Sequence, residues 1–411
     1  MRLLFFCLLI LGFDLIAFQT VQLAMQDFAK PVVLGITIIY WLIPVALIAW
    51  ILNNQTKDAA TLASDGNVRI NRTIFQLFYL AKFLLLFIFL MLQLSTLFLS
   101  GIAALFSSFN FSNNHAPLLA QMSVLLSGIP LLLMIYGMAR NRHRYIIYEV
   151  NVPIVNLPKA LEGLRIVQIS DVHAGSFTHK APLKKGIELI NAAKADLVFF
   201  TGDLVNSIAA EMEPYTDVFD KIRAKHGVFS ILGNHDYGDY ARWPSQEAKL
   251  TNLNRLIHLQ KQMGWHLLLN ENRLLSINGE KVAIIGVENY SASPRFSKYG
   301  DLAKAYEGSQ LAALKLLLSH DPSHWEDQVA PDRPDIAITF SGHTHGAQFG
   351  IEIEGWFKWS PVKYFYKQWA GLYQKGQQFL YVNRGFGYLG YPGRVGILPE
   401  ITVMNLRGTE S

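Results

Sequence analysis

Long apolar stretches occupy the first third of this chain and separate it from a more polar remainder. The stretches cover residues 3–25, 33–52, 83–106 and 117–139. About 20 apolar residues in a helix cross a hydrocarbon core of about 30 Å, so each stretch is long enough to span a membrane. Only short polar joints separate them, which favours membrane helices over buried helices of a soluble protein. We therefore predict a transmembrane region over residues 1–145.

Lysine and arginine positions predict how these spans are oriented. Basic residues before the first span, between the second and third, and after the fourth are Arg2, Lys57, Arg69, Arg72, Arg140, Arg142 and Arg144. The other side offers Lys30, and the joint at residues 107–116 has no Lys or Arg. The pattern predicts that both termini are cytoplasmic. If the first stretch were instead a cleaved signal peptide, the last two joints would still predict a cytoplasmic C-terminus.

Two charged residues lie in or near these spans. Asp14 falls inside the first, and Lys82 directly precedes the third. We expect Asp14 to face the bundle interior, where a partner satisfies it or it serves a function. We expect Lys82 to extend its ammonium group to the membrane interface.

From residue 146 onward the pattern changes to short apolar runs separated by amphipathic segments. The runs that predict strands are 164–170, 196–201, 227–232, 267–269, 273–277, 282–287, 316–318, 336–340, 379–382 and 401–405. The segments that predict helices are 180–194, 211–225 and 246–263. Asn278-Gly279 is a strong hairpin signal. The pattern predicts an α/β domain over residues 146–411 with a mixed, strand-rich core.

Polar clusters follow five of these runs directly. They read Asp171-Val-His173, Gly202-Asp203, Gly233-Asn234-His235-Asp236, Ser319-His320 and Gly342-His343-Thr344-His345. Residues just past the strand ends of an open α/β sheet meet in one crevice. Carboxylate, amide and imidazole ligands suit Mn, Fe or Zn, and two such ions about 3.5–4 Å apart can neutralise a phosphoester and activate water. The clusters therefore predict a two-metal hydrolytic site.

The ordered blocks resemble the calcineurin-like metallophosphoesterase superfamily over residues 160–406. The ending, with Asn383-Arg384-Gly385-Phe386-Gly387 and Pro399-Glu400-Ile401, is similar to the bacterial membrane-associated branch of that superfamily. The resemblance implies an αββα sandwich behind the four N-terminal transmembrane helices. It also implies a metal-dependent phosphoesterase that resides in a bacterial inner membrane and holds two divalent ions, Mn, Fe or Zn.

The resemblance further implies a role for each polar residue. The implied ligands are Asp171, His173 and His345 for one ion, Asn234, His320 and His343 for the other, and Asp203 as the bridge. A metal-bridging hydroxide would attack phosphorus, and His235 would act at the leaving group as proton donor or charge stabiliser. Many relatives carry Asp three residues after the bridging Asp to orient that histidine. Here the position is Asn206, which leaves the orienting partner open.

The substrate class is less constrained than the chemistry. A phosphodiester, pyrophosphate or phosphomonoester fits, and the membrane helices favour a lipid-linked one near membrane lipid. The formal net charge of +5 is too small for the basic stripe of a nucleic-acid binder, so we expect no nucleic-acid partner. Arg384 and Arg394 could contact a substrate phosphate or could be ordinary surface residues. The alternative to an enzyme is a membrane sensor or scaffold with a regulatory, metal-binding domain.

An aromatic segment follows the last histidine cluster. Its aromatic residues are Trp356, Phe357, Trp359, Tyr364, Phe365, Tyr366 and Trp369, and they alternate with Lys358, Lys363 and Lys367. Such a composition is typical of a surface that contacts a membrane interface. It also fits core aromatics beside solvated lysines, and the sequence favours the second interpretation.

Overall fold

The computed structural model describes residues 2–53, 66–105, 115–353 and 355–409. The chain divides into two compact units, Met1–Tyr136 and Gly137–Ser411, which we call the helical unit and the sheet unit. Lys57 and residues 107–114, which entered the orientation prediction, lie outside the described residues.

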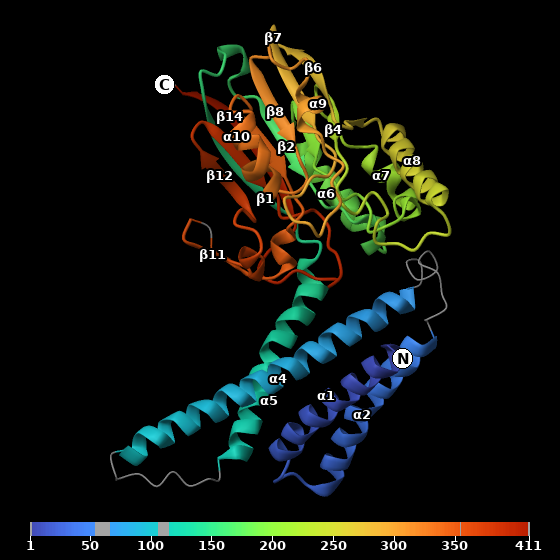
Figure 1. Ribbon diagram of the computed structural model, residues 1–411, viewed down its shortest axis with the longest axis vertical. Coiled ribbons are helices and arrows are strands. Elements are labelled where there is room, and N and C mark those ends of the chain that lie inside the picture. Colours follow the sequence, from blue (N-terminus) through green and yellow to red (C-terminus); the bar gives the residue numbers. More distant parts are fainter. Residues whose placement is uncertain (1, 54–65, 106–114, 354, 410–411) are drawn as a thin grey trace. The chain divides into compact units, whose positions relative to one another are not determined.

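Four long helices form the helical unit (Figure 1). They are α1 (Arg2–Ala24), α2 (Lys30–Asn53), α4 (Gly66–Leu105) and α5 (Ala116–Tyr136). Four segments are long and apolar enough to cross a membrane: Phe5–Ala24, Lys30–Asn53, Thr73–Ile102 and Ala116–Asn141, the last of which continues from α5 into the π turn at Gly137–Asn141. Many of their leucine, isoleucine and phenylalanine side chains are exposed, as expected where lipid takes the place of water as the surrounding solvent. The four predicted spans are confirmed as helices.

A buried ion pair lies inside the helical unit. The Lys82 ammonium group contacts Asp14 Oδ1, and Tyr79 Oη donates to Asp14 Oδ2 at 3.1 Å. Lys82 also lies over the Tyr40 ring, 4.0 Å from its centroid. The expectation that Asp14 faces the interior is confirmed. The expectation that Lys82 extends to the interface is wrong, because its charge is neutralised within the bundle.

Two six-stranded sheets form the centre of the sheet unit. The strands are β1 (Ile146–Val155), β2 (Arg165–Ile169), β3 (Leu197–Phe200), β4 (Val228–Ser230), β5 (His266–Leu267), β6 (Glu271–Ile277), β7 (Glu280–Gly286), β8 (Leu314–Leu318), β9 (Ile338–Ser341), β10 (Ile351–Ile353), β11 (Phe357–Trp359), β12 (Gly371–Lys375), β13 (Gln378–Val382) and β14 (Glu400–Thr409). The first sheet has the order β1-β14-β2-β3-β4-β5, and the second has the order β12-β13-β9-β8-β7-β6. β10 and β11 form a separate antiparallel hairpin.

Short helices connect and cover these sheets. The α-helices are α6 (Lys180–Ala192), α7 (Thr216–Phe219), α8 (Gln246–Gln262), α9 (Leu302–Tyr306) and α10 (Ala330–Asp332). The 3-10 and π segments are η1 (Gly137–Asn141), η2 (Lys159–Leu161), η3 (Ala174–Ser176), η4 (Ala209–Glu211), η5 (Glu213–Tyr215), η6 (Trp325–Val329), η7 (His345–Gln348) and η8 (Pro361–Tyr364).

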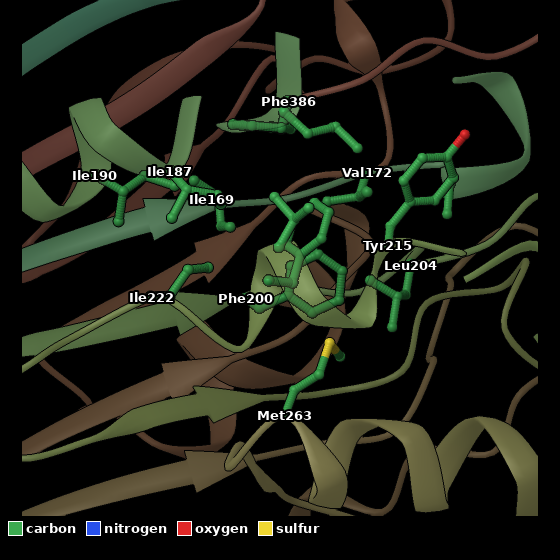
Figure 2. Packing of buried hydrophobic residues seen from close by; sticks show 14 of the residues in the cluster. Ile169, Val172, Ile187, Ile190, Phe200, Leu204, Tyr215, Ile222, Met263 and Phe386 are labelled. Atoms are coloured by element: carbon green, nitrogen blue, oxygen red, sulfur yellow. The ribbon is translucent and has the colours of Figure 1, made fainter. Parts of the chain in front are cut away.

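Three apolar layers hold the sheets and helices together. Between the sheets, the Phe199 ring of the first packs edge-on against Phe340 of the second, with centroids 4.9 Å apart. On the outer face of the first sheet, Ile169 and Phe200 pack with Ile187 and Ile190 of α6 (Figure 2). A third cluster covers the outer face of the second sheet. This helix–sheet–sheet–helix layering is the predicted αββα sandwich.

Several segments differ from the sequence prediction, among them strands β10, β11 and β12, which were not predicted. The helix expected at residues 211–225 is replaced by η5, α7 and turns. The half-buried Glu211 carboxylate accepts from the Asn206 and Ile208 amides, and Pro214 lies in the first turn of η5. Strand β1 was not predicted, although it extends the first sheet by pairing with β14 in parallel. The hairpin at Asn278-Gly279 is confirmed by the pairing of Ile277 with Glu280.

Candidate metal centre

Strand ends from both sheets bring the polar clusters to one place. In the first sheet β2, β3 and β4 run parallel, and in the second β8 and β9 run parallel. Asp171 and His173 follow β2, Asp203 follows β3, Asn234 and His235 follow β4, His320 follows β8, and His343 and His345 follow β9. Each side chain is therefore held by a rigid strand at its carboxyl end, as precise positioning requires.

The backbone at five of these positions adopts the left-handed region. The φ angles are 53° at Asp171, 50° at His173, 59° at Asp203, 71° at His343 and 51° at His345. Such a conformation costs about 1–3 kcal/mol for a residue other than glycine, and it concentrates at functional sites. The strained turns aim these side chains inward at the point where each strand ends.

The first cluster contains Asp171, His173 and His345, whose candidate ligand atoms lie within 4.8 Å of one another. His173 Nε2 and His345 Nε2 are 3.0 Å apart, and Asp171 Oδ1 is 3.2 Å from His345 Nε2. All three side chains are buried. Three buried ligand atoms that converge within 4.8 Å of one another fit a bound cation.

The second cluster contains Asp203, His320 and His343, and Asn234 adds an amide oxygen to it. Asn234 Oδ1 lies 2.8 Å from His343 Nδ1 and 3.1 Å from His320 Nε2. Asp203 Oδ2 lies 3.3 Å from His320 Nε2. The donor set is two imidazoles, a carboxylate and an amide oxygen, which suits Mn, Fe or Zn.

Asp203 connects the two clusters. Its Oδ2 is 3.3 Å from His320 Nε2 in the second cluster and 3.6 Å from His173 Nε2 in the first. Asp203 Oδ1 accepts from the backbone amide of His235 at 2.9 Å. One carboxylate thus reaches both groups of ligands while the His235 loop holds its orientation.

Electrostatics show that the clusters require positive charge. Burial alone would raise the pKa of Asp203, but His320 and His235 hold it well below its usual value. Burial disfavours a charged His320, yet Asp203 and Asp171 raise its pKa to about 10. A divalent ion at the clusters would neutralise the two carboxylates.

Asp236 and Gly342 shape the loops around the two ligand clusters. The buried Asp236 carboxylate accepts from the amides of Asp203 at 2.9 Å, Leu204 at 2.8 Å and Gly233 at 2.9 Å, so it ties together the loops after β3 and β4. At Gly342 a Cβ atom would collide with the Ser170 hydroxyl and the Asp171 carboxylate. A side chain there would displace a candidate ligand, which explains the glycine.

His235 lies at the edge of the two clusters. Its ring packs edge-on to His173, with centroids 5.0 Å apart, and it is partly exposed. Its Nδ1 lies 2.6 Å from the backbone carbonyl of Asn206, whereas the Asn206 side chain hydrogen-bonds Ser176. The backbone carbonyl of Asn206, rather than its side chain, therefore orients the imidazole.

Sequence reasoning missed the residues that surround His343. Tyr366 Oη lies 2.7 Å from His343 Nε2 and 3.3 Å from Asp321 Oδ2, and the Phe296 ring packs edge-on against His343. Phe296, Tyr366 and Phe365 also line a cavity of about 810 Å³. Asp321 directly follows His320, so a signal for it was present in the sequence. Tyr366 was recognised only as a member of the aromatic segment and Phe296 was not recognised at all, because the two residues come from separate loops.

The two arginines considered for phosphate binding have structural roles instead. Arg384 is buried and paired with Glu400, at 2.7 Å, and with Glu352. Arg394 is fully buried, and its guanidinium donates to the carbonyls of Arg384 at 2.6 Å and Gly385 at 3.1 Å. Both suggestions, phosphate contact and ordinary surface residue, are therefore wrong.

Comparison with known proteins agrees with this architecture. Residues 164–347 match the calcineurin-like phosphoesterase family, and residues 1–142 match the transmembrane domain described as that of a probable calcineurin-like phosphoesterase. The second match and the four apolar helices show that the chain is an integral membrane protein.

Curated relatives carry the same kind of domain. A transmembrane protein with metallophosphoesterase domain from Danio rerio is 28% identical over 68% of this chain and 61% of its own length. The uncharacterized metallophosphoesterase YkuE of Bacillus subtilis is 29% identical over 67% of this chain and 90% of its own. The UDP-2,3-diacylglucosamine pyrophosphatase LpxG of Chlamydia trachomatis is 28% identical over 56% of this chain and 81% of its own. The match thus spans about three fifths of the Danio rerio relative. The chain thus combines an N-terminal four-helix transmembrane domain with a calcineurin-like phosphoesterase domain.

Proposed function

We propose that this protein is a membrane-anchored phosphoesterase that uses two divalent metal ions, Mn, Fe or Zn. The observation that carries the proposal is the pair of buried ligand clusters with Asp203 within 3.6 Å of both. Asp171, His173 and His345 would hold one ion, and Asn234, His320 and His343 would hold the other. The proposed domain boundary lies between residues 145 and 146.

The bound ions would supply positive charge for the phosphoryl oxygens and a water molecule of lowered pKa as the nucleophile. The residues of this chain account for the rest of the chemistry. Asp203 aligns the two ligand groups, and Asp236 fixes the loop that carries Asn234. His235, oriented by the Asn206 carbonyl, faces the open side of the centre. There it can stabilise charge on the phosphoryl group or donate a proton to the leaving oxygen.

We further propose that the substrate is a lipid-linked phosphodiester or pyrophosphate. Three features support this class: the membrane helices, the relative named as a UDP-2,3-diacylglucosamine pyrophosphatase, and the cavity beside His343 that includes Phe296 and Phe365. Apolar side chains next to an ion site suit a molecule with a charged phosphoryl group and an apolar part. We place the sheet unit on the cytoplasmic side of a bacterial inner membrane.

A hydrolysis assay with the full chain tests this proposal. The protein is purified in detergent with Mn or Zn and assayed against a nitrophenyl phosphomonoester, a nitrophenyl phosphodiester and a lipid-linked pyrophosphate. We expect hydrolysis by the wild type and its loss in Asp203→Asn. Asp217→Asn is the matched control, because Asp217 is an exposed residue that pairs with Lys180 on the surface, and it should retain full activity.

Two outcomes would contradict the proposal. Hydrolysis that is equal in the wild type and Asp203→Asn would show that the centre does not carry the activity. Metal binding without hydrolysis of any substrate would favour the alternative function, a membrane sensor or scaffold with a regulatory metal domain. A C-terminal reporter that is active only outside the cytoplasm would overturn the proposed orientation.

A further inference from the structure

Apolar side chains gather on the surface of the sheet unit at the β10–β11 hairpin and the turn η8. The members are Ile351, Ile353, Trp356, Phe357, Tyr364 and Phe365, and we call them the aromatic rim. Trp356 is 81% exposed, Tyr364 71% and Phe365 73%. Soluble proteins rarely expose a contiguous apolar patch of this kind unless it binds something. Trp369 of the same segment is buried, so the segment contains both a core anchor and an exposed edge.

Lysines border the aromatic rim, and the acidic residues near it are paired with basic side chains. The Lys363 ammonium group lies over the Tyr364 ring, 5.2 Å from its centroid, and the Lys367 side chain is exposed beside Glu326. Glu352 of β10 is engaged by the buried Arg384, whose Nε donates to it at 2.9 Å. Aromatic rings with adjacent lysines are the composition that binds the headgroup region of an anionic bilayer.

Contacts within the sheet unit connect the aromatic rim to the end of the last membrane span. Residues 137–141 close the candidate span Ala116–Asn141 and belong to the sheet unit. Asn141 Nδ2 donates to the Arg394 carbonyl at 3.2 Å, and a Cβ at Gly137 would collide with Val395. Val395 in turn contacts the residue that precedes β10, because its carbonyl accepts a hydrogen bond from the Gly350 amide at 2.9 Å. Because β10 begins at the following residue, the hairpin starts beside residues 137–141, which directly follow α5 in the chain.

We propose that the aromatic rim is a bilayer-contact surface that inserts into the interfacial region of an anionic membrane. Its exposed rings would lose water in the headgroup layer, and Lys363 and Lys367 would pair with lipid phosphates. The contact itself does not require catalysis.

The aromatic rim also joins the candidate metal centre. Phe365 lines the cavity of about 810 Å³ together with Tyr366 and Phe296, and Tyr366 Oη reaches His343 Nε2 at 2.7 Å. A lipid whose headgroup lies at the rim would therefore have its phosphoryl group close to the ligand clusters. This use of the surface rests on the proposed function, whereas the bilayer contact can be measured without it.

Fluorescent probes on the full chain test the contact. The single cysteine is first removed by Cys7→Ser. Trp356→Cys or Phe365→Cys is then introduced into this background, and an environment-sensitive fluorophore is attached to the new thiol. The control is Leu311→Cys, because Leu311 is 88% exposed and precedes β8, at the opposite end of that strand from His320. Each protein is placed, one copy per nanodisc, in phosphatidylglycerol or phosphatidylcholine that contains brominated lipid.

We expect blue-shifted emission and quenching by brominated lipid at positions 356 and 365, and neither at position 311. Quenching should be weaker in phosphatidylcholine, and Lys363→Glu should weaken it in phosphatidylglycerol. Emission at 356 and 365 that matches position 311 would overturn the proposal. A spectral shift that requires two copies per nanodisc would also overturn it, because the rim would then bind a second chain. A protein that shows quenching but no hydrolysis would contradict only the proposed function.

Discussion

The helical unit and the sheet unit both bury acidic side chains, but they neutralise them differently. In the helical unit, Asp14 contacts the Lys82 ammonium group and accepts from the Tyr79 hydroxyl. In the sheet unit, Asp171 and Asp203 face imidazole nitrogens that also face one another, such as those of His173 and His345 at 3.0 Å. The Asp14 carboxylate has a cation and a hydrogen-bond donor as partners. In the sheet unit, by contrast, carboxylate and imidazole ligand atoms converge on one another within each cluster.

This difference distinguishes a structural charge from a ligand site. A buried ion pair with matching hydrogen bonds is self-sufficient, and removing one partner leaves an uncompensated charge. A set of buried carboxylates and imidazoles is satisfied only when a cation or a proton supplies the missing charge. Asp203 and Asp171 raise the pKa of His320 to about 10, which reflects the demand of the two carboxylates for positive charge. We therefore expect substitutions in the two units to affect different measurements.

The largest expected effect concerns His235, which has a position beside the clusters without belonging to them. His235→Ala should lower the rate of hydrolysis by about 10²–10⁴-fold, the usual contribution of a positioned acid or charge stabiliser. The measurement is kcat for the preferred substrate, and metal content should remain at the wild-type level. Loss of metal together with activity would instead place His235 among the ligands.

The next effect concerns the ion pair in the helical unit. Asp14→Asn leaves the Lys82 ammonium group buried without an anion, which should destabilise the helical unit by about 3–5 kcal/mol. Thermal or denaturant unfolding of the protein in detergent measures this change. The double variant with Lys82→Met should recover most of the lost stability, because neither charge remains. A single variant as stable as the wild type would show that the pair contributes nothing to the bundle.

Apolar side chains provide a third way to sharpen the comparison. Leu316 lies fully buried between the two sheets, so Leu316→Ala should destabilise the sheet unit by about 2–5 kcal/mol. Leu125 is an exposed side chain on α5, and Leu125→Ala should change stability little, since lipid is as apolar as leucine. The unfolding temperatures of the two variants in detergent test this expectation. Equal losses would mean that Leu125 packs against protein.

The smallest effect concerns Tyr366. Tyr366→Phe removes the hydroxyl that lies 2.7 Å from His343 Nε2 but keeps the ring. Removing a partner that orients a metal ligand typically costs about tenfold or more in metal affinity. Competition with a chelator measures this loss, and Tyr364→Phe on the exposed surface is the control. Unchanged affinity would show that Asp321 alone orients His343.

Much of the fold could be predicted because each local pattern had one physical cause. Apolar runs of membrane-spanning length identified the helices, and short buried runs that end in a polar cluster identified β2, β3, β4, β8 and β9. The segment at residues 211–225 was misassigned because its periodicity does not reveal that the Glu211 side chain bonds the preceding loop. The partnership of Lys82 with Asp14 depends on tertiary packing, so position relative to the span was insufficient to predict it.

The candidate site shows the same limit. The residues expected to act together do converge, and the φ angles of Asp171 and His345 explain how strand ends turn them inward. Their roles as ligands and the domain boundary at residue 145 stay predictions. Tyr366 was identified only as part of an aromatic segment, since its contact with His343 depends on how a distant loop folds back. The orienting group for His235 is a backbone carbonyl, which no side-chain pattern encodes.

Metal content tests the central claim, that seven side chains from two sheets hold two cations. The full chain is purified in detergent without chelators, and bound Mn, Fe and Zn are measured per polypeptide. The account predicts two ions per wild-type chain, and it predicts a clear loss in Asp171→Asn and in His320→Ala with Asp217→Asn unchanged. A wild-type chain that binds no metal when Mn, Fe and Zn are supplied, or the same content in every variant, would contradict it.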